Sequence, residues 1–215
     1  MRLADGDKFS GSALKRSQIR LEKLDFFDTV DIATVPTKSP SELDLRVRVK
    51  EKSTGMVSGG VGYSTYSNVF ISARVMEGNL FGKGYYLGAS SAFSGKTTRY
   101  GISFTNPSLY NTRLSVGGDS YFERYTYEDY DKDTLGIKSR FAYPLGEYTN
   151  VYWGYRLDRY DIKDVDSDAA KKIKDMKGVN WSSVLNVGII RDTTNRRFNP
   201  SEGSIHKLNM EMGGG

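Results

Sequence analysis

The chain has 215 residues, with 31 lysines and arginines against 26 aspartates and glutamates and a formal net charge of +5. It contains no cysteine and a single histidine, His206, which excludes disulfide scaffolds, Cys/His zinc sites and cysteine-based catalysis. Basic and acidic residues are interspersed without a lysine- or arginine-rich block, so no nucleic-acid partner is expected. Glycine (23) and tyrosine (15) are frequent and proline (5) is rare, a combination that favours long β-strands.

The first segment, residues 1–52, predicts a small α+β module. Between Ser12 and Leu24 there is no glycine or proline, and apolar residues recur at helical spacing with Ser17 on the same face, so a helix is expected. An extended stretch follows. Residues 43–50 then alternate strictly between apolar and charged side chains, which is typical of a strand with one solvent-exposed face. A helix followed by two strands makes a compact α+β unit.

From Gly55 to the end of the chain, segments with a period of two follow one another. They predict about nine strands in series, arranged as an antiparallel meander. The expected strands are about 9–11 residues long, the length that crosses a membrane at a tilt, whereas strands of soluble proteins cluster near about 5–6 residues. The pattern therefore favours a membrane β-barrel over a soluble sandwich.

Charged residues within the expected strands alternate with the apolar ones. An arginine or lysine that faced lipid near the bilayer midplane would cost about 2–4 kcal/mol. The alternation therefore predicts a lipid-facing side, with Ile71, Ile102, Val116, Ile137 and Leu157, and a water-facing side that includes Ser72, Ser103 and Ser139. The lumen-facing charges are expected to be Arg74, Arg99, Arg113, Lys138, Arg140 and Arg156, accompanied by Asp119 and Asp158.

The connections between the expected strands alternate in length. Short turns are expected near residues 80–84, 106–108 and 144–147, whereas long connections are expected at 123–133 and 160–178. A barrel with short turns on one side and long loops on the other is typical of bacterial outer membranes.

One segment of the expected sheet is rich in glycine. It comprises Gly55, Met56, Val57, Ser58, Gly59, Gly60, Val61, Gly62 and Tyr63. Glycines weaken side-chain packing and leave register loosely specified, as a strand that pairs reversibly with another chain requires. They also let a sheet bend at a barrel seam, the junction between the first and last strands. The two interpretations are compatible.

Several of these segments resemble a known family, the BamA-type outer-membrane assembly proteins of the bacterial surface antigen group. The resemblance to the end of the last POTRA domain and to the first barrel strand is carried by residues 24–30, 47–55 and 60–64. The resemblance to the periplasmic turns of that family is carried by residues 79–84, 105–107 and 191–203. It covers nearly the whole chain.

The resemblance implies a mainly β protein built from two parts. Residues 1–52 would be a partial POTRA domain that lacks its first strand, located in the periplasm. Residues 53–215 would be the N-terminal half of a transmembrane β-barrel in the cell outer membrane. The partners implied are unfolded outer-membrane protein clients, assembly-complex lipoproteins and the lipid bilayer.

Two functions remain open on this basis. The chain could belong to an assembly factor that inserts and folds β-barrel precursors by strand templating at residues 55–63, the barrel seam. It could instead belong to a two-partner-secretion or translocation pore, in which the lumen-facing basic residues would matter. No catalytic residue, cofactor or metal is expected for either function. Asp164 to Asp168 begins like a calcium loop, but Ala169 stands where such a loop needs glycine.

Overall fold

The computed structural model of the chain describes residues 6–24, 26–37, 42–65, 68–194 and 201–214. Its internal contacts divide the chain into two units, Met1–Gly55 and Met56–Gly215. This division lies near the domain boundary expected between Lys52 and Ser53. Each unit is described by itself below.

In its described residues, the first unit contains one helix and a two-stranded sheet. The helix α1 spans Gly11–Lys23, and the antiparallel strands are β1 (Phe27–Pro36) and β2 (Leu43–Glu51). The Ser10 side chain caps the helix by accepting a hydrogen bond from the backbone N–H of Ala13 at 3.4 Å. On the helix, Ser17 is fully buried, and the neighbouring Gln18 amide donates to the carbonyl oxygen of Val30 in β1 at 3.3 Å. The expected helix and two strands are thus confirmed.

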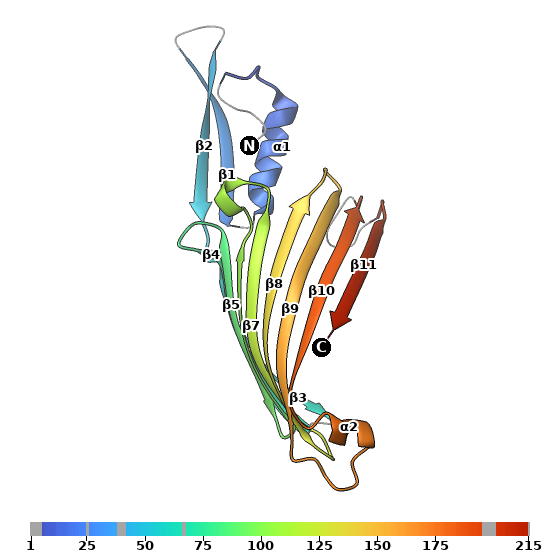
Figure 1. Ribbon diagram of the computed structural model, residues 1–215. Helices are drawn as coiled ribbons and strands as arrows, with labels where there is room; N and C mark the ends of the chain where they lie inside the picture. The colour runs from blue at the N-terminus through green and yellow to red at the C-terminus, as the bar shows by residue number, and fades with distance from the viewer. Residues whose placement is uncertain (1–5, 25, 38–41, 66–67, 195–200, 215) are drawn as a thin grey trace. The chain divides into compact units, whose positions relative to one another are not determined.

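Over the part of the chain that the structure describes, the second unit forms a single nine-stranded sheet in which each strand lies beside its neighbours in the sequence. Figure 1 shows the strands side by side, and every neighbouring pair from β4 to β11 is antiparallel. The strands are β3 (Gly55–Ser64), β4 (Asn68–Leu80), β5 (Tyr85–Ser94), β6 (Thr97–Asn106), β7 (Ser115–Thr126), β8 (Asp131–Pro144), β9 (Thr149–Lys163), β10 (Gly178–Asp192) and β11 (Ile205–Gly214). The predicted antiparallel meander is confirmed. The sheet curves but does not close, because β3 and β11 are its two edge strands.

The connections lie at two ends of the sheet. At the near end, where β3 begins, residues 81–84, 107–114 and 145–148 join successive strands. The segment 107–114 includes the short 3₁₀ helix η1 (Leu109–Asn111), and Phe81 and Tyr110 have φ angles of 58° and 51°.

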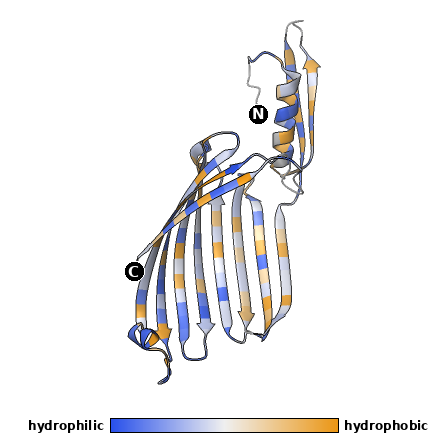
Figure 2. Ribbon diagram, turned by 90° about the vertical axis from the view of Figure 1, so that its right-hand side faces the viewer, coloured by the Kyte–Doolittle hydropathy of each residue, from blue (hydrophilic) through white to orange (hydrophobic). Residues whose placement is uncertain are grey.

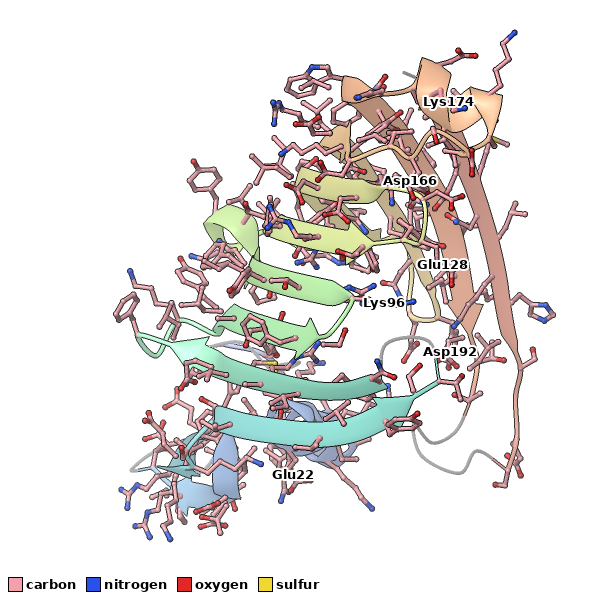
Figure 3. The ribbon with its side chains drawn as sticks, turned by 90° about the horizontal axis from the view of Figure 1, so that it is seen from below. Glu22, Lys96, Glu128, Asp166, Lys174 and Asp192 are labelled. Atoms are coloured by element: carbon pink, nitrogen blue, oxygen red, sulfur yellow. The ribbon has the colours of Figure 1, made fainter. Side chains whose placement is uncertain are left out.

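The opposite end, the far end, carries the turns at 95–96 and 127–130 and the connection 164–177. The last of these contains the short helix α2 (Lys171–Asp175). Figure 3 labels Lys96 and Glu128 in the two turns, and Asp166 and Lys174 in the third connection. The expectation of a long loop at 123–133 is wrong, because β7 continues to Thr126 and β8 begins at Asp131.

Figure 2 shows bands of different hydropathy along the strands. The register of the ladders places the apolar and polar side chains on opposite faces. Ile102 lies opposite Ser120, which lies opposite Ile137, which in turn lies opposite Leu157. These residues share the apolar face. The expectation for Ser139 is wrong: it alternates with Lys138 and Arg140 and lies opposite Gly118, on the apolar face. Within the described ranges, none of the helices combines the length and the apolarity needed to cross a bilayer.

Candidate functional site

The glycine-rich segment forms the edge strand β3. Among the described residues β3 is hydrogen-bonded on one side only, to β4. Side chains of β3 are widely open to solvent, with exposed fractions of 79% for Val57, 75% for Val61 and 70% for Tyr63. An edge strand of this kind presents a row of unpaired backbone N–H and C=O groups to any strand that can reach it.

The polar face of β3 contacts β4 at two glycines. The ring of Phe70 lies over Gly62, where a Cβ atom would come within 2.4 Å of the ring carbon Cζ. At Gly60 a Cβ atom would meet only the Ser72 hydroxyl oxygen, at 3.3 Å. That hydroxyl donates a long hydrogen bond of 3.5 Å to the Gly60 carbonyl oxygen. Packing therefore demands glycine at position 62, while position 60 is more open.

Two further glycines on the polar face lie beneath aromatic rings. Tyr121 lies directly opposite Gly136 and Tyr152 directly opposite Gly188 in the ladders. At each glycine a Cβ atom would come within 2.2 Å of the tyrosine ring. The Tyr121 hydroxyl reaches across β8 and donates to the carboxylate of Asp158 in β9. Because Gly136 has no side chain, Tyr121 of β7 can cross β8 and bond to β9, and three neighbouring strands are linked.

Three of the six predicted lumen-facing cations, Arg99, Arg140 and Arg156, are paired with acids on the polar face. Arg140 forms a bidentate ion pair with Asp119, at 2.7 and 2.9 Å, and also donates to the Thr105 hydroxyl at 3.1 Å. Arg156 lies 3.2 Å from Asp158, and Arg99 lies 3.6 Å from Glu123. This surface is a network of charges of both signs.

Arg74 and Lys138 lie on the same polar face, and neither forms an ion pair with another described residue. Arg113 differs from the expectation. It precedes β7 in the near-end connection, and its guanidinium lies 5.8 Å from the ring centre of Tyr143, a residue of the apolar face. The pattern placed Arg113 within a strand, but the strand begins only at Ser115.

A second ion-pair network, not anticipated from the sequence, lies on the apolar face at the far end. Arg124 lies opposite Asp133 and binds its carboxylate through two hydrogen bonds of 2.6 and 2.7 Å. Lys163 contacts both Asp133, at 3.2 Å, and Asp161, at 3.3 Å. These residues fall in the segments 123–133 and 160–178, which are expected to be loops, so the sequence pattern assigns them to neither face. Among the residues that the structure describes, no group of three or more His, Asp or Glu side chains is arranged to hold a metal ion.

Comparison with known proteins identifies the family. Residues 79–215 match the Omp85 superfamily domain, and the chain belongs to the Omp85 superfamily. It is similar to the outer membrane protein assembly factor BamA of Nitratidesulfovibrio vulgaris, with 50% identity over 215 residues, which is all of this chain and 27% of that protein. It is also similar to BamA of Neisseria meningitidis serogroup B, with 26% identity over 231 residues, covering 99% of this chain and 29% of that protein. The chain therefore spans less than a third of these relatives.

The fold has a counterpart among solved structures. The crystal structure of BamA from Haemophilus ducreyi lacking POTRA domains 1-3 matches with a TM-score of 0.79 and 24% identity, over 99% of this chain and 44% of that one. The expected resemblance to BamA-type proteins is confirmed, as are the mainly β fold, the incomplete antiparallel barrel and the location in the outer membrane. The POTRA assignment of residues 1–52 stays a prediction.

Proposed function

We propose that this chain is part of an outer-membrane protein assembly factor, and that β3 is the template on which a strand of an unfolded client is added. Membership of the Omp85 superfamily and the names of the BamA relatives support this role. The observation that carries the mechanism is the position of β3, a glycine-rich strand at the edge of the sheet.

In this mechanism the client strand pairs with the N–H and C=O groups on the open side of β3, by β-augmentation. Neither a nucleotide nor a metal is required, because an unpaired backbone group in hydrocarbon costs several kcal/mol and pairing removes that cost. The glycines weaken side-chain packing on β3, so that strands carrying different side chains can pair with it. The packing of Phe70 on Gly62 keeps β3 attached to β4 while its other edge exchanges partners.

The first unit fits a periplasmic role in this scheme. We assign it to the end of a POTRA domain, where precursors and assembly-complex lipoproteins would bind. Its strand β2 exposes apolar side chains at Leu43, Val47 and Val49, which offers a surface for an extended, partly apolar chain.

The alternative, a secretion or translocation pore, depends on a basic lumen. The ion pairs of Arg99, Arg140 and Arg156 with acidic neighbours neutralise much of the positive charge on the polar face. Arg74 and Lys138 remain as cations for an acidic passenger. The charge balance therefore supports the assembly role more than the pore.

The experiment that separates the two functions locks the seam. A disulfide from a cysteine at Ser58 to the last strand of the complete barrel should stop client insertion, whereas conduction through a lumen does not need the seam to open. The measurement is client folding in vesicles, followed by its heat-modifiable gel shift. The same protein after reduction is the control. Normal client folding by the locked protein would rule out templating at β3.

A further inference from the structure

A recurring contact in the sheet concerns glycines of the polar face. Among the residues that the structure describes, an aromatic ring from one strand lies over a glycine of the next strand in three places: Phe70 over Gly62, Tyr121 over Gly136 and Tyr152 over Gly188. Tyr121 lies directly opposite Gly136 in the ladder, and Tyr152 lies directly opposite Gly188. Aromatic residues that cover strand glycines in this way help to pin the register of neighbouring strands.

Gly60 is a polar-face glycine at the open edge, and no described ring covers it. The Ser72 hydroxyl oxygen is the only described atom within 4 Å of a Cβ position at Gly60, neighbours in the chain aside. Beside it lies a hollow of about 450 Å³, lined by Gly60 and mainly small residues and bounded by Arg74 and Arg99. A ring placed over Gly60 would enter this hollow, which Ser72, Arg74 and Arg99 line. The Ser72 hydroxyl would be within reach of a polar group on the ring, and the two guanidiniums within reach of its face.

We infer that Gly60 sets the register of the strand that adds to β3, by accepting an aromatic side chain from the lumen-facing position directly opposite it. The occupant is a client strand with a tyrosine, phenylalanine or tryptophan at that position. This inference rests on the proposed function and specifies it further: β3 selects clients by the placement of one inward-facing aromatic residue. The geometry repeats that of Tyr121, whose ring crosses Gly136 and whose hydroxyl bonds to the next strand.

The test is disulfide mapping in the complete protein with a client arrested during assembly. A cysteine replaces Ser58, which lies two residues from Gly60 on the same face, and single cysteines are moved along the terminal strand of the client. We expect one dominant cross-link, in the register that places an aromatic residue opposite Gly60. Replacing that client residue by alanine should lower the dominant cross-link roughly threefold and spread the remainder over other registers.

The chain offers a matched control at Gly59. Gly59→Val and Gly60→Val add the same side chain at adjacent positions. At position 59 that side chain would lie on the apolar face, where a Cβ atom would meet only the Ser72 carbonyl oxygen, at 3.6 Å. Gly60→Val should reduce the dominant cross-link as much as replacing the aromatic client residue by alanine does. Combining Gly60→Val with that client substitution should cause no further loss. Gly59→Val should leave the register unchanged. Should Gly60→Val fail the gel-shift test of folding, the client variants alone decide.

The outcomes separate the inference from the function on which it rests. Cross-links in a register that leaves a non-aromatic residue opposite Gly60, or equal effects of the two valine variants, would overturn the inference and leave templating intact. The absence of any cross-link between β3 and the client would overturn the proposed function itself.

Discussion

Single residues link neighbouring strands on the polar face. Tyr121, Gly136 and Asp158 occupy one row across β7, β8 and β9, and the tyrosine can reach the carboxylate only because position 136 has no side chain. The backbone conformation of Gly136 is ordinary for a strand. Glycine is required at this position because the Tyr121 ring approaches so closely.

We expect Gly136→Val to destabilise the complete protein by about 1–3 kcal/mol, because the displaced Tyr121 ring loses its hydrogen bond to the partly buried Asp158 carboxylate, which keeps only its ion pair with Arg156. The measurement is equilibrium unfolding in urea, with the protein in lipid vesicles. Gly118→Val is the matched control, since a Cβ atom there meets only the Lys138 carbonyl oxygen at 3.8 Å. Equal losses for the two variants would show that glycine acts here through strand curvature and not through the ring.

Arg140→Lys should separate geometry from charge. A lysine keeps the positive charge but cannot make the two parallel hydrogen bonds to Asp119 together with the one to Thr105. Because the arginine is partly open to solvent, we expect a loss of only about 1 kcal/mol in the same unfolding measurement. In an Asp119→Asn background the loss should shrink to near zero. An undiminished loss there would contradict the assigned pairing.

At the scale of the strand, the two faces should meet different solvents. Ile71, Ile102 and Ile137 lie on the apolar face with exposed fractions of 56%, 60% and 56%, whereas Ser72 and Ser103 lie on the polar face. The chain has no cysteine of its own, so single cysteines can be spin-labelled at each site. We expect labels on the three isoleucine sites to be accessible to oxygen in lipid, and labels on the two serine sites to a water-soluble nickel complex. Equal accessibility at both sets would contradict a membrane-spanning sheet.

Alternation along each strand made the sheet predictable from sequence, because a side-chain period of two depends on the chain alone. The ends of strands were harder to place. Charged residues such as Arg124 and Asp133 interrupt the alternation, so the segment 123–133 reads as a loop although most of it is strand. Arg113 has the opposite error: it fits the alternation with Leu114 and Val116, so the pattern predicts a strand that begins before Ser115, where β7 actually starts.

Contacts between strands could not be predicted in this way. The packing of Phe70 on Gly62 and the bond from Tyr121 to Asp158 depend on register, which is a property of two or three strands together. Glycine–aromatic pairs are visible in the sequence only once the opposing positions are known. The edge strand itself was identifiable from its four glycines.

At the scale of the whole chain, the nine-stranded sheet ends in two strands with one open side each. We expect residues 1–215, produced without the remainder of the barrel, to associate through β3 and β11, because unpaired backbone groups at a sheet edge are satisfied by another copy. Light scattering after size-exclusion chromatography in detergent should show oligomers. A monodisperse monomer would contradict this expectation. Lysine substitutions at Val57 and Met210 should reduce the association.

The order of the strands in space repeats their order in the chain, and this has a consequence for folding kinetics. Each strand from β4 onward can find its place by closing a short connection, and the entropic cost of closure grows only slowly with its length. Contacts so local in sequence favour rapid folding, hairpin by hairpin, in the order in which the chain is delivered. The slow step in a complete barrel of this kind is then the pairing of β3 with a strand distant in the sequence, and until that step occurs the open edge of β3 persists.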